Sequence, residues 1–413
     1  MPSLATRLER PPLDRDSVER FAHSRNEPRW LVDARLAAVD QYLATPWPRA
    51  DVGEEWRRFP LEDVPYEALA LAAPEPAPLA PSHESGVLDL ALADAVRAHG
   101  DLVRPWLERD GGPVAQAAIR AYARAAWTGG RLVRIPAGLT VERPIDVVTV
   151  PSVSRTIVVA ERGSHAVVVE ELRSIDGDTP VLAMPLLEVH LADEAALDLV
   201  QIQRFGPSVW VLGSQYYRSE RASRLSSFNV FVGGHASKIG IGSDIVGDGA
   251  TVHLSGLVAA GETQRVDFNV FQDLAGSHSE SILLYLAALY DRARAVTYGV
   301  IRVEPQSRRT SSYQECRNLL LSEHAAAEPI PVLEILTNDV ARCGHGATAG
   351  SLDLADLFYV MSRGLPREDA ERLIVRGFFE RVIAKVADAD VRRRMLAALE
   401  PRIGSIAALE GAA

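Results

Sequence analysis

The sequence predicts a mainly β protein in which a β-solenoid is flanked by N-terminal and C-terminal helical regions. The middle of the chain alternates short runs of β-branched residues with glycine, aspartate and serine, a pattern typical of strands joined by turns. Small residues that open strands recur there every 26 to 30 residues or so, and periods of roughly 20 to 50 residues are typical of stacked repeats. Both ends of the chain instead carry apolar residues at three- and four-residue spacing, which indicates helices.

The N-terminal region, residues 1–130, mixes helical periodicity with proline-rich connectors. The helical spacing is found in residues 87–96 and 114–127, and a proline-rich linker occupies residues 73–81. We therefore expect a small helical region with a linker inside it.

The β region, residues 131–350, contains no helical pattern of useful length. Its predicted strands include residues 156–159, 166–169, 197–200, 228–231, 251–254 and 300–303. The small residues that mark the repeat are Ala166, Ala196, Ala222, Ala250 and Ser279. One coil cannot bury its own apolar side, whereas stacked coils share a continuous core, so the near-constant spacing favours a solenoid over a β-sandwich.

The C-terminal region, residues 351–413, predicts two successive helices. The first carries Leu354, Leu357, Phe358 and Met361. Gly364 can then supply a left-handed cap, and Pro366 suits the start of the next helix. The predicted apolar face of that second helix is Ala370, Leu373, Ile374, Gly377, Phe378 and Val382. Packing against the solenoid accounts for most of these side chains.

Composition limits the possible functions. With 413 residues, the chain exceeds the size at which one compact core usually stops growing, so several regions or one elongated fold are expected. The formal charge of −11, without a basic stripe, argues against nucleic acid as a partner. The N-terminus lacks the apolar core of a signal peptide and no apolar run is long enough to span a bilayer, so we expect a cytoplasmic protein with no membrane partner.

Several short motifs do not support an enzyme. Residues 240–245 lack the third glycine of a dinucleotide fingerprint, and we interpret them as a turn between coils. Residues 344–351 lack the lysine of a phosphate loop, so no nucleotide is expected to bind this chain. The sequence also has no nucleophile elbow and no zinc-protease spacing. We expect His190 and His253 to be surface or structural residues.

Both cysteines of the chain, Cys316 and Cys343, fall within one short stretch, and His345 lies beside the second. Two thiols and an imidazole suit iron, sulfur species or zinc. Free cysteine is also among the most buried residue types, so inert core thiols are the alternative.

The same stretch resembles the SufB/SufD family of iron-sulfur cluster assembly proteins, and the SufD branch most. The resemblance is carried by residues 333–335, 339–340, 343–348, 357–359, 362–364 and 377–379, with weaker similarity at 134–138, 293–296 and 299–301. It implies a right-handed parallel β-helix between helical ends. It further implies a non-catalytic scaffold subunit of a complex of SufB, SufC and SufD that assembles iron-sulfur clusters.

The resemblance also suggests roles for the three candidate residues. Cys316 occupies the position of the cysteine that SufB uses in cluster assembly, whereas the run from Cys343 to His345 corresponds to the SufD side, where the histidine is functional near the SufB interface. SufD proteins commonly lack a cysteine at position 316, so this chain departs from the pattern, and Cys316 is either an ancestral-type ligand or an incidental strand residue. Glu334 is expected to be an outward structural carboxylate.

The family implies two protein partners and a shared cargo. We expect a SufB-like subunit to pair through the β-helix and a SufC-like ATPase to dock on the C-terminal helices, over residues 364–385. Two cysteines cannot supply the four thiolates that usually hold an iron-sulfur cluster. The expected cargo is therefore a transient cluster or iron shared with a partner subunit, with His345 as a neutral ligand or a proton acceptor. Participation of a flavin stays open.

Two alternatives remain at the level of sequence. The first is a SufB-like homodimeric scaffold, suggested by Cys316; the short N-terminal region and the scarcity of cysteines weigh against it. The second is a β-helix polysaccharide-active enzyme, such as a lyase or esterase. Such an enzyme would carry clustered aspartate and arginine on successive coils, which the sequence does not show, and would not need the C-terminal helices.

Overall fold

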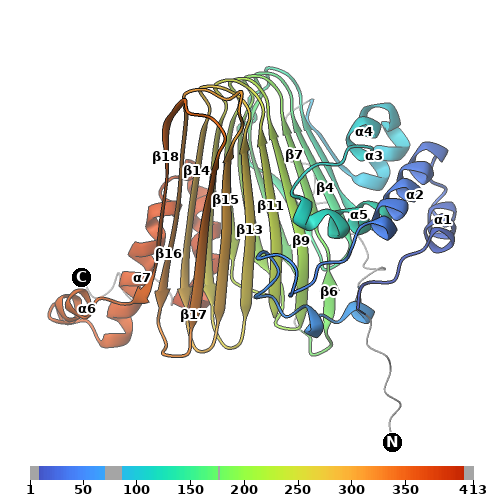
Figure 1. The fold of residues 1–413 in the computed structure, drawn as a ribbon. Coiled ribbons are helices and arrows are strands. Elements are labelled where there is room, and N and C mark those ends of the chain that lie inside the picture. The colour runs from blue at the N-terminus through green and yellow to red at the C-terminus, as the bar shows by residue number, and fades with distance from the viewer. Residues whose placement is uncertain (1–8, 70–85, 175–176, 404–413) are drawn as a thin grey trace, which may run out of the picture.

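The fold is a parallel β-solenoid of about eight turns with helices at both ends (Figure 1). It was obtained as a computed structural model, which describes residues 9–69, 86–174 and 177–403. The chain passes alternately between two sheets, so that each new strand lies parallel to the previous strand of its own sheet. The predicted solenoid is therefore confirmed.

Among the described residues, ten strands form the first sheet, here sheet I, in the order β1-β2-β4-β7-β9-β11-β13-β15-β17, with β6 pairing with β9. Their bounds are β1 Leu88–Ala91, β2 Gly129–Ile135, β4 Ser154–Ala160, β6 Val181–Ala183, β7 Leu186–Leu191, β9 Val209–Ser219, β11 Ala236–Ile245, β13 Arg265–Leu274, β15 Arg294–Val303 and β17 Ala326–Ile335.

The second sheet, here sheet II, has eight strands in the described part of the chain, in the order β18-β16-β14-β12-β10-β8-β5-β3. Their bounds are β3 Ile145–Thr149, β5 His165–Arg173, β8 Ala196–Arg204, β10 Arg224–Phe231, β12 Thr251–Ala260, β14 Glu280–Leu289, β16 Thr310–Leu320 and β18 Val340–Ser351. The repeat predicted from small residues is the repeat of this sheet: each of those residues lies within two residues of the start of one of its strands, from β5 to β14.

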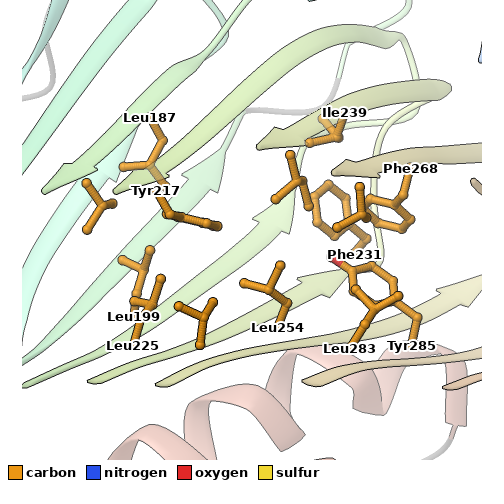
Figure 2. Close-up of a cluster of buried hydrophobic side chains, with 14 of the residues drawn as sticks. Leu187, Leu199, Tyr217, Leu225, Phe231, Ile239, Leu254, Phe268, Leu283 and Tyr285 are labelled. Atoms are coloured by element: carbon orange, nitrogen blue, oxygen red, sulfur yellow. The ribbon is translucent and has the colours of Figure 1, made fainter. Parts of the chain in front are cut away.

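The main core fills the lumen between the two sheets. Alternate residues of each strand point inward and are buried, as the two-residue period of a strand requires. Figure 2 shows part of this core, in which the rings of Phe231, Phe268 and Tyr285 lie together. Phe268 packs edge-to-face against Phe231 and against Tyr285, with 4.9 Å between ring centroids in both pairs. These contacts cross from coil to coil, so neighbouring coils stabilise one another.

The N-terminal helices cover one end of the solenoid and part of sheet I (Figure 1). They are α1 Arg15–Ser24, α2 Arg29–Ala44, α3 Leu92–Ala98, α4 Gly100–Leu107 and α5 Ala117–Ala126, with 3-10 turns Leu61–Asp63, Tyr66–Ala68 and Val114–Gln116. The helix predicted over 114–127 is confirmed. The prediction for 87–96 is wrong in its first half, because Leu88–Ala91 is a strand that pairs antiparallel with β2. The proline-rich linker lies outside the described residues.

The prediction of a turn at residues 240–245 is also wrong, because these residues belong to β11. The glycines serve a close approach. A Cβ atom at Gly240 would lie 2.1 Å from Cγ of Gln116, and one at Gly242 would lie 2.5 Å from Cδ of Pro113. Glycine is therefore required where the N-terminal region presses on the outer face of sheet I.

The C-terminal helices are α6 Leu354–Met361, α7 Arg367–Ile383 and α8 Ala389–Ile403. Helices α7 and α8 bury apolar side chains against the outer face of sheet II. The left-handed cap at Gly364, with φ +98°, and the start of α7 after Pro366 are as predicted. The predicted face of α7 is partly wrong: Leu373 and Gly377 are exposed, and the buried row is Ala370, Val375, Phe379, Val382 and Ile383. No helix in the described ranges is long and apolar enough to cross a membrane.

A buried lysine fastens the N-terminal region to sheet I. Lys238 is fully buried on the outer face of β11, where its ammonium donates to Asp267 Oδ1 at 2.7 Å and to the carbonyl of Glu55. It also lies over the ring of Trp56, 4.9 Å from the centroid. A buried charge that loses its partner is strongly destabilising, so this contact constrains the position of the segment around residue 55.

We expect Lys238→Met to lower the free energy of unfolding by about 3–5 kcal/mol, because it leaves the Asp267 carboxylate buried without a counter-ion. Urea denaturation followed by circular dichroism measures the change. Exposed Lys385 supplies the matched control, and Lys385→Met should change stability by less than about 0.5 kcal/mol. Equal stability of the two variants would contradict the proposed stabilising role of the buried Lys238–Asp267 pair.

Candidate functional site

The two sheets end together at the C-terminal end of the solenoid. Within the described part of the chain, β17 is the last strand of sheet I and β18 the last strand of sheet II, and each has only one paired neighbour. These strands lie at the end of the stack away from the N-terminal helices (Figure 1). The final coil therefore presents two free backbone edges, and its inward-facing side chains are covered on one side only.

All three candidate residues lie in the last two coils of sheet II. Cys316 is in β16, one coil from the end, where it is part of the lumenal core. Cys343 and His345 are in β18, in register with Ser312 and Gln314 of β16. Since Ser312, Gln314 and Cys316 alternate on the buried side of β16, their partners in β18 share that side. The structure thus places the three predicted residues at one end of the lumen.

Burial separates the three residues. Cys316 is only 5% exposed, Cys343 is half-buried against the edge of the core, and His345 is exposed. His345 lies in β18 between Gly344 and Gly346, which face the opposite side of the strand. The absence of side chains at these two glycines leaves room for the aromatic ring of Tyr313. A Cβ atom at Gly346 would lie 3.1 Å from the hydroxyl of Tyr313, and one at Gly344 would lie 3.4 Å from the ring.

The environment of Cys316 suppresses its ionisation. Burial, followed by the nearby Glu315 carboxylate, raises the pKa of the Cys316 thiol to about 12. The thiolate is the form that binds metal and attacks electrophiles, and almost none is present at neutral pH. Cys316 is therefore an inert thiol as long as the last coil stays in place above it.

A buried polar ladder inside the lumen leads to Cys316. Across sheet II, register joins Glu170, Gln201, Asn229, Gly256, Tyr285, Cys316 and Ala347, one residue from each strand from β5 to β18. Tyr285 leans over Gly256, where a Cβ atom would lie 2.5 Å from its ring. Glu170, Gln201 and Asn229 recur at about the spacing of one coil. This polar repeat is not detected when only apolar and small residues are compared.

Hydrogen bonds satisfy the inner half of this ladder. The Glu170 carboxylate accepts from the hydroxyls of Thr149, at 2.7 Å, and Thr156, at 3.1 Å, and from the amide of Gln201, at 2.8 Å. The amide of Gln215 in turn donates to Gln201 at 2.6 Å and to Asn229 at 3.0 Å. Such a network makes the lumen between the first coils polar, with its buried polar groups paired to one another.

In the described ranges, no group of three or more histidine, cysteine, aspartate or glutamate side chains lies close enough to hold a metal ion. Cys316, Cys343 and His345 therefore share one end of the lumen without forming a closed ligand set in this chain. Any iron held there needs further ligands from outside, as a four-thiolate cluster does.

The other singled-out residues lie away from this end. His190 is buried in β7 against Trp106, with 4.6 Å between ring centroids, and burial lowers its pKa to about 3. His253 Nε2 lies 2.7 Å from a carboxylate oxygen of Glu280 on the outer face of sheet II. Glu334 is exposed, one residue before the end of β17.

Comparison with known proteins matches this architecture. Residues 146–378 match the family model described as SUF system FeS cluster assembly, SufBD core domain. The chain belongs to the SufB/SufD family. Membership sets aside the polysaccharide-active enzyme considered from the sequence. The match covers the strands from β3 to β18 together with helix α6 and most of α7.

Curated relatives extend the match over the chain. The iron-sulfur cluster assembly protein SufD of Bacillus subtilis is 27% identical over 97% of this chain and 100% of that protein. An iron-sulfur cluster assembly SufBD family protein of Mycobacterium tuberculosis is 33% identical over 52% of this chain and 56% of that protein. SufD of Escherichia coli is 25% identical over 58% of this chain and 56% of that protein. The chain thus matches about half the length of the last two.

We expect the two thiols of this SufB/SufD family member to differ sharply in reactivity. With a pKa of about 12, Cys316 is a thiolate in roughly one molecule in 10,000 at pH 8, whereas half-buried Cys343 is open at the end of the stack. Iodoacetamide labelling of the native protein, followed by peptide mass spectrometry, should modify Cys343 at least about 100-fold faster. Equal rates in the native protein would contradict the buried position of Cys316, and labelling in urea provides the control for intrinsic reactivity.

Proposed function

We propose that this protein is a SufD-like, non-catalytic scaffold subunit that assembles iron-sulfur clusters together with a SufB-like subunit and a SufC-like ATPase. The observation that carries the proposal is the open last coil, which presents His345 and Cys343 between two unpaired strand edges. Membership in the SufB/SufD family and full-length similarity to a SufD protein support it.

The SufB-like partner pairs with the open end. The free edges of β17 and β18 offer backbone donors and acceptors to further strands, and unprotected edges of this length are otherwise an aggregation hazard. Strand addition would extend both sheets and continue the lumen into the partner. The inward side chains of the last coil would then gain a second wall, which is what the lumenal core lacks at this end.

The cargo, iron or a transient iron-sulfur cluster, is shared across that interface. His345 is exposed at the end of the lumen, where its imidazole can bind iron or accept a proton from an incoming thiol. Cys343 lies two residues away on the same side of the strand. A partner that supplies thiolates completes a coordination shell that this chain leaves open, and an incompletely held cluster can be released.

Cys316 takes part only if the last coil moves. The thiol lies one coil below His345 and is held protonated by burial, so iron binding there requires both exposure and loss of the proton. This position is the specific observation that favours the second candidate function, a SufB-like homodimeric scaffold. In that case two copies would pair through the same edges and bring two Cys316 ladders into line.

The ATPase docks on the C-terminal helices. The apolar residues of α7 that are buried pack against sheet II and cannot contact a partner. The surface available to a partner is therefore the solvent-facing side of these helices. Helix α6 contributes most to it, since Leu354 is 74% exposed and Phe358 73% exposed. Tyr359, on the same helix, is 59% exposed, and exposed apolar groups of this size mark protein interaction sites.

We expect His345→Ala to lower the iron and acid-labile sulfide content of the reconstituted complex at least about tenfold, without affecting folding or subunit association, because an exposed ligand contributes chemistry rather than stability. Exposed His324, in the turn before β17, provides the matched control. Cys316→Ser should matter less and Cys343→Ser least. Normal cluster content with His345→Ala would remove the proposed site, and loss with Cys316→Ser alone would favour the homodimeric scaffold.

We expect Phe358→Asp to abolish co-purification of the ATPase partner, because it places a charge in the exposed apolar surface of α6 without touching the core. Leu43→Asp, at a residue 48% exposed on α2, is the control and should leave co-purification unchanged. Normal capture of the ATPase by Phe358→Asp would place the docking surface elsewhere.

A further inference from the structure

A groove of about 860 Å³ separates the N-terminal region from the outer face of sheet I, away from the open end of the lumen. One wall comes from residues 45–56 and 112–118, and the floor comes from the outward side chains of β11, β13 and β15. Neither the family match nor the proposed scaffold role assigns anything to it.

One wall of the groove is apolar and rich in proline. It is formed by Pro46, Trp47, Pro48 and Pro113. At the rim, Val52 is 63% exposed and Val114 is 89% exposed, which is unusual for valine in a folded protein. Across the floor, Gly242, Phe271 and Val300 lie in register on neighbouring strands, so the apolar strip runs perpendicular to the strands.

The next row of the floor is acidic. Two residues further along the same strands, register joins Asp244, Asp273, Arg302 and Glu334. Arg302 also pairs with Glu304, with 2.8 Å between Nε and Oε1, so one arginine faces four carboxylates in and beside this row. Asp244 accepts a hydrogen bond of 2.6 Å from the Tyr216 hydroxyl. The groove therefore combines an apolar strip with a strip of net negative charge.

Asp273 is a carboxylate of this acidic strip with an oxygen that lacks a hydrogen-bond donor. This oxygen, Oδ1, is buried, and leaving it unpaired is costly for a carboxylate. Burial, together with the nearby Glu304 and Asp244, raises its pKa to about 6. A cationic N–H donor placed in the groove would offset this cost. In the described residues these carboxylates do not form a group able to hold a metal ion, so an organic cation fits better.

We propose that this groove binds an extended, proline-containing segment of another protein, with an arginine or lysine of that segment placed against Asp244 and Asp273. Prolines and tryptophan on one wall favour an extended chain that presents its own prolines, because such segments dock in aromatic grooves at low entropic cost. The groove is open along its rim, so a small cation alone would leave the exposed valines uncovered. The basic side chain offsets the net negative charge of the acidic row.

Fluorescence anisotropy tests this site on the full chain with a labelled ten-residue proline-rich peptide that carries one central arginine. We expect saturable binding, at least about tenfold weaker binding when glutamate replaces the arginine, and about fivefold weaker binding to Asp273→Asn. Val114→Ser should also weaken binding. Asp198→Asn and Leu43→Ser, on sheet II and α2, are matched controls that should leave the affinity unchanged.

The pH dependence gives an independent readout. Asp273 is faced by Asp244 from β11 and by Arg302 and Glu304 from β15 and its end, and it ionises only above a pKa of about 6. Affinity for the arginine peptide should therefore rise between pH 5 and pH 7, and this rise should be lost in Asp273→Asn. Lack of saturable binding up to about 1 mM would overturn the proposal. Equal binding of the glutamate peptide, or equal competition by the amide of free arginine, would overturn it as well.

Discussion

Stacking of successive coils is the constraint on which the rest of this structure depends. No coil can bury its inner face alone, so each one relies on contacts such as those of Phe268 with Phe231 and Tyr285 in the neighbouring coils. At the N-terminal end the stack is closed by the antiparallel strand β1 and by helices. At the other end, within the described residues, nothing follows β17 and β18. The family's cargo chemistry is therefore proposed for the C-terminal end of the stack, where the last strands of both sheets have no following coil among the described residues.

The lumen near that end keeps the thiol of Cys316 protonated and unreactive. Polar side chains inside a solenoid are tolerated only when hydrogen-bonded, as the three neutral donors around Glu170 show. Tyr285 is different, because its buried hydroxyl has no hydrogen-bond partner, and the neighbouring Cys316 is protonated by burial. The ladder is thus satisfied in its inner coils and unsatisfied toward the open end. Completion by a partner, or displacement of the last coil, would change the state of Cys316 more than that of any inner residue.

The sequence was sufficient for the architecture because strand repeats and helix caps are local signals. Strand spacing predicted the coils, and Gly364 and Pro366 predicted the joint between α6 and α7. Features that depend on distant packing were missed. Gly240 lies in a strand rather than a turn, and glycine is required there because Gln116, more than a hundred positions away, packs against it. The buried face of α7 is centred on Phe379 because packing on sheet II decides which side of the helix is covered. Cys316, Cys343 and His345 share one end of the lumen, as their closeness in the sequence suggested. Their different degrees of burial, which make their reactivities differ, cannot be read from sequence spacing.

The N-terminal region also connects to the open end, and this links the two proposed interaction sites. Lys238 holds the segment around Glu55 to β11, and Arg58 continues across the sheet to pair with Glu328 on the edge strand β17. Lys238 is one of two lysines in the chain, and its compact ammonium contacts a carboxylate, a carbonyl and an indole face together. Sheet I between β11 and β17 is therefore a common floor. A segment bound in the groove would contact the sheet whose last strand, β17, is part of the edge proposed for the SufB-like partner.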